Sequence, residues 1–310
     1  MLDNTGRTAG IISAAKKITR KEQTSSLLQI GSISAIKRIV LTFQVAGIDP
    51  IVIIAGFDSE EIERELCDYG VIFLHKDHYE QSQLFHLAKI GLKYLEDKCD
   101  KVMFTPVDIP LFGPDTLKKM MSCGGKAVSP VYQHRIGHPT LVSSDLIPLL
   151  LAYEGEGGMP GALKELGVSR QFIEVEDAGI IEDIEPLEHK SELIRKHNTD
   201  IFHPYVRLSL EKESLFFDAK TKLLLILIQE RNSVKSACKA MALSYSKAWN
   251  MLNTLEEAVQ YKVITRQQGG SRGGRTCLTE EGEKLLRNFE LFEDRVKSFT
   301  KAEFARIFLE

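Results

Sequence analysis

Short apolar runs alternate with amphipathic stretches over the first two thirds of the chain. Four runs have the length and composition of buried strands, at residues 10–15, 51–57, 70–75 and 101–108. Stretches between them repeat apolar residues at helical spacing, at residues 34–45, 60–69 and 83–95. This alternation predicts a three-layer α/β fold, with a mostly parallel sheet covered by helices on both faces. Ligands of such sheets bind beyond the carboxyl ends of the strands, so we expect a site there.

The pattern changes at the polar stretch 195–205, which contains one proline. We therefore expect two domains, residues 1–198 and residues 199–310. Two short alternating runs after the boundary predict a hairpin. Three helices are then expected, at residues 219–230, 233–242 and 244–259.

A brief turn at Leu243 and Ser244 joins the last two of these helices, which predicts a helix-turn-helix. The first turn of the second helix is expected to contact base edges in the major groove through Ser244, Tyr245, Ser246 and Lys247. Trp249 shares a helix face with Leu252 and Leu255. We interpret this tryptophan as a core residue; a base-stacking platform is the alternative.

A glycine-rich loop, "QQGGSRGGRT", occupies residues 267–276 and is close to a phosphate-binding loop in spacing. Such a loop must run from a strand directly into a helix, whose amides then contact phosphates. Here an extended segment, "TCLT", follows the glycines, and the next helix is expected only from Thr279, with Glu280 and Glu281 in its first turn. The glycines are therefore predicted to form a hairpin tip, or wing. Arg272 and Arg275 on this tip are candidates for contacts with a DNA backbone.

The chain of 310 residues has a net charge of −3, but the charge is unevenly distributed. Between residues 229 and 276, the basic residues are Arg231, Lys235, Lys239, Lys247, Lys262, Arg266, Arg272 and Arg275. The acidic residues in this range are Glu230, Glu256 and Glu257. This local excess indicates a partner that carries phosphates; a solvated basic surface is the alternative.

The five cysteines are odd in number and widely spaced, which argues against a disulfide framework and a zinc site. The N-terminus lacks a signal-peptide pattern, and the longest apolar run, 223–228, is too short to span a bilayer. We expect a cytoplasmic protein that does not bind membranes.

The motifs of the C-terminal part resemble a known family. Residues 223–286, which include "SYSKAW", the double-glycine wing and "LTEEG", resemble the winged-helix DNA-binding domain of the molybdenum-responsive ModE family. The resemblance implies a dimer that binds double-stranded DNA at a palindromic operator. No molybdate-binding module follows the winged helix before Glu310, so molybdate sensing is not implied.

The last predicted helix carries an apolar seam at spacings of four and three, formed by Leu285, Phe289, Phe292, Val296 and Phe299. A seam of this kind is typical of paired helices, so we expect a C-terminal dimerisation helix and a homodimer. The alternative is that the seam packs against its own domain.

The N-terminal part resembles the MobA-like nucleotidyltransferases that attach a nucleotide to molybdopterin, which have a nucleotide-diphospho-sugar transferase-like fold. The resemblance rests on "SAAKKITRKEQTSSLLQIGS", "TPVDIPLF", "GHPTLV", "GEGGMPGAL" and "GIIEDIEPLEH". It implies Mg²⁺ ligands at Asp108 and Glu185. It also implies nucleotide-binding candidates at Ala14, Ala15, Arg20 and Lys76, and ligands such as CTP, GTP or molybdopterin.

Several positions of the opening loop depart from the family pattern. Lys16 and Glu22 replace two glycines, and Ser25 replaces a lysine that neutralises phosphate. A Cβ restricts the turn, and the carboxylate of Glu22 adds negative charge beside a triphosphate. Lys76 stands where the family has an Asn that contacts the nucleotide. Whether the domain catalyses nucleotidyl transfer is therefore left open.

Three hypotheses follow. The first is a DNA-binding regulator of molybdenum-cofactor or molybdoenzyme genes, whose N-terminal domain acts as a sensor of a nucleotide, a pterin or a partner. The second is an active Mg²⁺-dependent molybdopterin cytidylyl- or guanylyltransferase that also carries a DNA-binding module. In the third, the N-terminal domain is a dimerisation scaffold.

Overall fold

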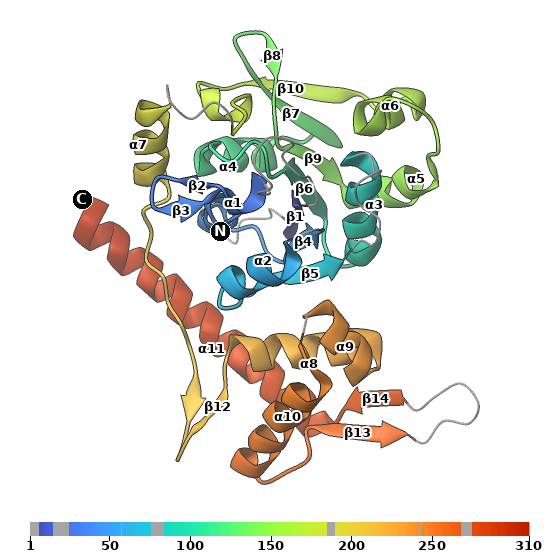
Figure 1. Cartoon of the computed structure of the whole chain (residues 1–310), viewed down its shortest axis with the longest axis vertical. Coiled ribbons are helices and arrows are strands. Elements are labelled where there is room, and N and C mark those ends of the chain that lie inside the picture. The colour runs from blue at the N-terminus through green and yellow to red at the C-terminus, as the bar shows by residue number, and fades with distance from the viewer. Residues whose placement is uncertain are drawn as a thin grey trace. The chain divides into compact units, whose positions relative to one another are not determined.

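The computed structural model of the protein describes residues 6–14, 25–56, 58–75, 84–184, 190–241, 243–267 and 275–309. Contacts divide the chain into two compact units, Met1–Phe202 and His203–Glu310 (Figure 1). The polar stretch that we expected at the boundary begins inside a helix, Ser191–Asp200. The division therefore falls just after this helix ends.

The first unit is built on an eight-stranded sheet in the order β10-β7-β9-β6-β1-β4-β5, with β8 paired to β7. Its strands are β1 (Thr8–Ala14), β4 (Ile51–Ala55), β5 (Ile72–His75), β6 (Lys101–Pro106), β7 (Ala127–Tyr132), β8 (Arg135–Ile136), β9 (Thr140–Ser143) and β10 (Arg170–Glu174). A separate hairpin comprises β2 (Gln29–Ile30) and β3 (Ile33–Ser34). Only β8 and β9 run antiparallel to their neighbours within this sheet. The prediction of a mostly parallel sheet is confirmed, and its four predicted strands are β1, β4, β5 and β6.

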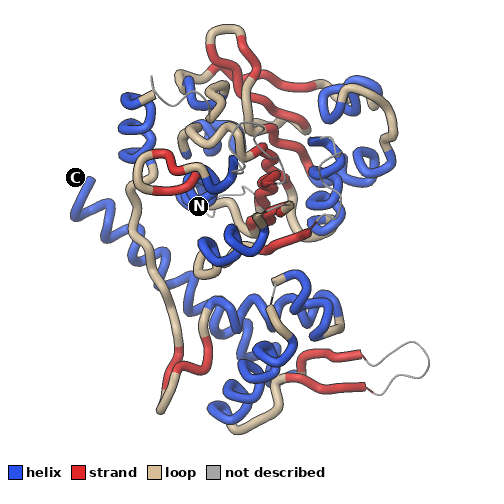
Figure 2. Tube along the Cα trace, in the orientation of Figure 1, coloured by secondary structure: helices blue, strands red, loops and turns tan. Residues whose placement is uncertain are grey.

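Helices cover both faces of this sheet, as the three-layer prediction requires (Figure 2). The helices of the unit are α1 (Ala35–Ala46), α2 (Ser59–Leu66), α3 (Leu84–Leu95), α4 (Pro114–Ser122), α5 (Ile147–Ala152), α6 (Gly158–Glu165) and α7 (Ser191–Asp200). Helices α1, α2 and α4 lie on one side, and α3, α5 and α6 lie on the other.

The central strand β1 shows how the two faces are packed. Ile12 joins the buried cluster that contains Ile36 and Phe43 of α1. Ile11 points to the other face, where Gly91 of α3 lies against it. A Cβ on Gly91 would come within 2.7 Å of the Ile11 side chain, so the glycine allows α3 to approach the sheet closely.

The second unit contains the predicted hairpin, helices and wing. Its elements are β11 (Leu210–Glu211), β12 (Leu215–Phe217), α8 (Ala219–Arg231), α9 (Val234–Ala240), α10 (Tyr245–Val259), β13 (Ile264–Gln267), β14 (Arg275–Leu278) and α11 (Glu280–Phe304). The apolar run in α8 is its centre, where Leu224, Leu225 and Ile228 are fully buried. Among the described residues, no helix combines the length and the hydropathy needed to cross a lipid bilayer.

The apolar seam of α11 is divided between two environments. Phe289 is 2% exposed and packs on Phe217, with ring centroids 4.5 Å apart, so this part of the seam belongs to the core of its own unit. Phe292 and Phe299 are 48% and 69% exposed. The packing alternative thus holds for the start of the helix, and its later part presents apolar side chains on the surface.

Candidate nucleic-acid and nucleotide sites

The helix-turn-helix consists of α9 and α10, and side-chain caps fix where both helices begin. Ser233 accepts a hydrogen bond from the Ser236 amide, and Ser244 accepts one from the Lys247 amide. Such caps satisfy amides that have no partner inside the helix. Ser244 was predicted to contact bases, and the structure places its hydroxyl at the cap of α10.

The first turn of α10 is accessible to a partner. Tyr245, Ser246 and Lys247 are all exposed, and Tyr245 is 53% exposed. The ring of Tyr245 meets the ring of Trp249 edge to face, with centroids 6.0 Å apart. Trp249 is half-buried and lies between the exposed Tyr245 and the core. Leu252, one turn further along the helix, is fully buried. The predicted contact residues therefore share one accessible helix end.

The wing strands β13 and β14 are antiparallel, with Thr265 opposite Cys277 and Gln267 opposite Arg275. No helix begins at Thr276, because Thr276 lies within β14 and α11 begins after its cap, Thr279. The first turn of α11 carries Glu280, Glu281 and Glu283. The hairpin prediction is confirmed, and a phosphate loop leading into a helix is ruled out for this segment. Arg272 lies outside the described residues.

Asn232 anchors the exposed Arg275 at the base of the wing. The Oδ1 atom of Asn232 accepts a hydrogen bond from Nε of Arg275 at 2.8 Å and one from the Cys277 thiol at 3.2 Å. The backbone carbonyl of Asn232 accepts from the Thr276 amide at 2.9 Å. Asn232 has a φ of 52°, a left-handed conformation that Asn tolerates better than most residues at a helix end. The guanidinium of Arg275 is thus held in place by the end of α8.

In the first unit, the predicted site residue Asp108 follows β6 and is 8% exposed. The Val107 amide donates to the carbonyl of Ser13 at 3.0 Å, which ties this loop to the carboxyl end of β1. The carbonyl of Asp108 accepts from the Ile184 amide at 2.8 Å. Ala14, another predicted residue, is buried, and its carbonyl accepts from the Ser26 hydroxyl at 3.2 Å. Asp108 and Ala14 therefore lie at the sheet edge where the fold class binds ligands.

His138 lies near Asp108 and beside a half-buried arginine. Burial, with Arg170 adding to the effect and Asp108 opposing it, lowers the pKa of His138 to about 4, so the imidazole is neutral at pH 7. Its Nδ1 atom is buried and has no hydrogen-bond partner among the described residues. Arg170 donates through Nε to the Ser129 hydroxyl at 2.8 Å. An imidazole of this kind can exchange a hydrogen bond with a ligand without adding charge.

A Mg²⁺ ion requires oxygen ligands, and it commonly takes one or two carboxylates together with substrate phosphates. Among the described residues, no group of three or more His, Cys, Asp or Glu side chains is arranged to hold a metal. Asp108 offers one carboxylate. The predicted positions Glu185, Ala15, Arg20 and Lys76 lie outside the described residues. The described part of the site therefore does not form a metal centre by itself.

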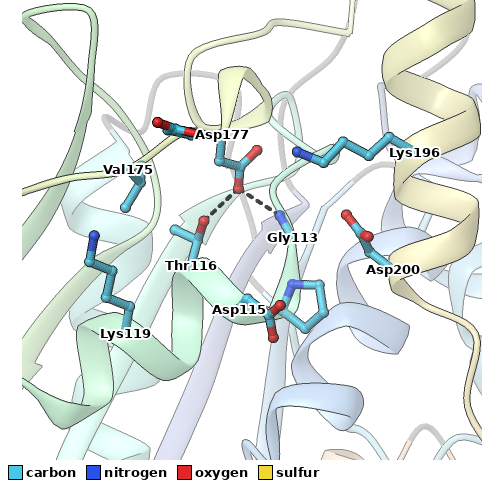
Figure 3. A pocket seen from close by; sticks show the side chains of 10 residues that line it. Gly113, Asp115, Thr116, Lys119, Val175, Asp177, Lys196 and Asp200 are labelled. Carbon is cyan, nitrogen blue, oxygen red and sulfur yellow. Dashed lines mark hydrogen bonds between the residues drawn. The ribbon is translucent and has the colours of Figure 1, made fainter. Parts of the chain in front are cut away.

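A surface pocket of about 240 Å³ lies elsewhere, at the start of α4 (Figure 3). Asp177 organises it: Oδ2 accepts from the Gly113 amide at 2.8 Å and from the Thr116 hydroxyl at 2.6 Å. Because Gly113 has no side chain, Asp177 serves as the cap of α4. Lys196 and Asp200 of α7 complete the lining with opposite charges. None of the predicted site residues lines this pocket, and its mixed charge favours neither an anion nor a cation.

Asn232 and Arg170 are the functional candidates that the sequence patterns did not indicate. A signal for Asn232 does exist in the sequence, because an Asn just after a helix and before a capping serine is typical of a left-handed helix end. Arg170 carries no comparable signal. Its role depends on the pairing of β10 with β7, which brings it to Ser129.

The protein has two parts. The first is an α/β unit of nucleotidyltransferase-like fold, with candidate ligand-binding residues at the carboxyl ends of its parallel strands, and the second is a winged helix-turn-helix. Residues 10–171 match the MobA-like NTP transferase domain, and the chain belongs to that family. A nucleotidyl transferase from Methanothermobacter thermautotroptrophicus has the same fold, with a TM-score of 0.51 and 19% identity over 63% of this chain and 98% of that one.

The C-terminal region is similar to curated transcriptional regulators. The regulator ModE of Haemophilus influenzae is 35% identical over 82 residues, which are 26% of this chain and 32% of that protein. The DNA-binding transcriptional dual regulator ModE of Escherichia coli K12 is 29% identical over 80 residues, which are 26% of this chain and 30% of its own. The chain thus spans about a third of the length of the curated relatives that it matches.

Proposed function

We propose that this protein is a DNA-binding regulator of molybdenum-cofactor or molybdoenzyme genes, whose nucleotidyltransferase-like unit acts as a sensor. The observation that carries the proposal is the accessible first turn of α10 beside an antiparallel wing, in a region similar to DNA-binding ModE regulators. A regulator of this kind acts on double-stranded DNA in the cytoplasm.

Binding to the DNA upstream of the protein's own gene, measured at several salt concentrations, tests the proposal. Arg272→Ala and Arg275→Ala should each weaken binding about equally for all sequences and reduce the log-affinity against log-salt slope by about one. Tyr245→Ala and Lys247→Ala should instead change the preference among sites, because base contacts carry discrimination. Unchanged slopes for both arginine variants would contradict the role of the wing.

The sensor role is supported by the sheet-edge position of Asp108 and by the buried Nδ1 atom of the neutral His138, which has no hydrogen-bond partner within the described part of the chain. The proposed ligand is a nucleotide such as CTP or GTP, or a pterin, with Mg²⁺ held by Asp108 and Glu185. A ligand that binds the folded state raises its thermal stability, so stabilisation by nucleotide without turnover supports a sensor. The absence of any response to nucleotides and pterins would leave a dimerisation scaffold.

A second candidate function, molybdopterin nucleotidyl transfer, is favoured by the retention of a carboxylate at Asp108 in a MobA-like domain. Release of pyrophosphate from CTP or GTP with Mg²⁺ and molybdopterin, abolished by Asp108→Ala, would establish it. The same measurement without any release would reject it.

The protein is further proposed to act as a homodimer. The exposed apolar side chains of Phe292 and Phe299 on α11 support this, because an apolar helix face is stabilised by pairing. Sedimentation of the wild type and of a Phe292→Glu, Phe299→Glu variant tests this, and a wild type that stays monomeric would contradict it.

A further inference from the structure

The accessible face of α10 extends beyond its first turn. Ser246, Asn250 and Asn253 follow one another at spacings of four and three, so they share one face of the helix, and all three are exposed. The opposite face, with Leu252 and Leu255, is fully buried. The exposed residues form a polar stripe, which we define as Ser246, Asn250 and Asn253.

The stripe has a length that suits a groove of DNA. From Ser246 to Asn253 the helix rises by about 10 Å, which is comparable to the width of about 12 Å of the major groove. The next exposed position on this face is Glu257, whose carboxylate would be repelled by phosphates. The neighbouring Glu256 has a structural contact instead, since its Oε1 atom accepts a hydrogen bond from the Val263 amide at 3.0 Å. Charge therefore limits the DNA-facing part of α10 to its first turns.

Asn250 and Asn253 are both exposed, so neither side chain belongs to the core of the unit. Neither Asn250 nor Asn253 has a hydrogen-bond partner among the described residues. Asn is also a weaker helix former than Ala, Lys or Glu, so two of them inside an exposed helix carry a small cost in stability. A carboxamide offers a donor and an acceptor side by side, the arrangement that pairs with N7 and N6 of adenine.

We infer that Asn250 determines sequence specificity by reading an adenine in the major groove, with Asn253 reading a neighbouring position. The inference rests on the proposed DNA-binding function and adds the residue and the base that it recognises. Tyr245 and Lys247 lie in the first turn next to the stripe, and the ring of Tyr245 meets the ring of Trp249 edge to face.

Selection of binding sites from randomised duplexes tests the inference on the full chain. Asn250→Ala should lower the preference for adenine at one position by roughly tenfold to a hundredfold, the range of a good bidentate contact, and leave the other positions unchanged. Replacement of that adenine by 7-deaza-adenine should weaken binding of the wild type. It should have no further effect on Asn250→Ala, because the contact is already absent.

Lys235→Ala is a matched control, since Lys235 is exposed on α9 and lies off the stripe; it should weaken binding to all sequences equally. Because Asn250 is exposed, its variant should retain the wild-type circular dichroism and Trp249 fluorescence. A uniform loss with an unchanged preference would overturn the inference and leave DNA binding intact. A wild type that binds no duplex would overturn the proposed function itself.

Discussion

Arg38 and His197 meet in the interior of the first unit, where Nη1 of Arg38 lies 3.1 Å from Nδ1 of His197. Arg38 is fully buried and His197 is 1% exposed. An arginine only donates hydrogen bonds, so Nδ1 must be unprotonated and the proton of the neutral ring must lie on Nε2. Nε2 is 3.1 Å from the Thr42 hydroxyl, which accepts this proton because it donates its own to the carbonyl of Arg38.

Other donors of Arg38 also have acceptors, and Nη2 donates to the Ile30 carbonyl. Nε donates to the Ile30 carbonyl at 2.9 Å, and Nη1 donates to Oδ1 of Asn198 at 2.8 Å. These contacts join α1, the β2–β3 hairpin and α7, which is the last helix before the boundary between the units. A buried charge without such partners would be strongly destabilising.

The arrangement predicts that the first unit loses stability in mild acid. Burial, together with Arg38, lowers the pKa of His197 from 6.5 to about 3. Below about pH 6.5, His197 of the unfolded chain takes up a proton that the folded chain excludes. The stability that the neutral His197 contributes is therefore complete above that pH and falls progressively toward pH 3. We expect a loss of roughly 1–3 kcal/mol by about pH 4.5.

Urea unfolding followed by circular dichroism at several pH values measures this loss. His197→Gln is the matched variant, because its amide can replace both hydrogen bonds and does not titrate. Its stability should fall less on acidification, and His138, which also titrates, is present in both proteins. Trp249 fluorescence reports the second unit separately. Equal losses of stability on acidification in the wild type and in His197→Gln would contradict this role of His197.

Glu293 of α11 also predicts a loss of stability in acid, here for the second unit, but in this case the charged form is the one that the fold stabilises. Its carboxylate lies 2.5 Å from Nζ of Lys222 and 3.2 Å from Nζ of Lys297, and its side chain is 12% exposed. Burial opposes ionisation, but these two lysines outweigh it and hold the pKa of Glu293 below its ordinary value. The stabilisation is present above about pH 4.5 and is lost as the pH falls below it.

Glu293→Gln should therefore destabilise the second unit by about 1–3 kcal/mol at pH 7, with a smaller difference below about pH 4. Denaturation followed by Trp249 fluorescence measures it. The exposed pair of Glu283 and Arg287 serves as the control, and Glu283→Gln should change stability by less than about 0.5 kcal/mol. A difference that does not depend on pH would argue against an ion pair.

Gly282 sets how closely α11 approaches the wing. A Cβ at this position would lie 2.2 Å from the carbonyl oxygen of Val263, next to β13, and backbone cannot move aside as a flexible side chain can. Gly282→Ala should destabilise the second unit by about 1–3 kcal/mol. Glu281→Ala, at the exposed neighbouring position, should have little effect. Equal Trp249 unfolding curves for the two variants would show that α11 shifts without cost.

The sequence was informative where local patterns decide the structure. Apolar runs located β1, β4, β5 and β6, and the residues that follow the glycine-rich loop distinguished a wing from a phosphate loop. Thr279 was correctly predicted as a helix cap, since its hydroxyl accepts from the Gly282 amide. These features depend on neighbours in the chain, which a sequence displays directly.

Contacts between distant residues were not predictable in this way. Arg38 reads as a polar position of an amphipathic helix, yet it is buried by a partner far away in the sequence. Phe289 and Phe299 have the same periodicity, but only the first meets Phe217 in the core. Periodicity identifies an apolar face and does not say what covers it, so the seam of α11 was read as one surface when it comprises two.

Asn232 provides the last prediction, which concerns the positioning of Arg275 rather than its charge. Asn232→Gly keeps the left-handed backbone, because glycine adopts a φ of 52° without strain, and it removes the acceptor of the 2.8 Å bond from Arg275. If the proposed DNA contact is correct, affinity should fall about threefold to tenfold, since a mobile guanidinium loses entropy on binding. The slope of log affinity against log salt should stay unchanged, because the charge remains, whereas Arg275→Ala should reduce it by about one.

Fluorescence anisotropy with one duplex at several salt concentrations separates these outcomes. An Asn232→Gly protein with wild-type affinity would show that Arg275 needs no anchor, and a reduced slope would show that the loop as a whole has moved.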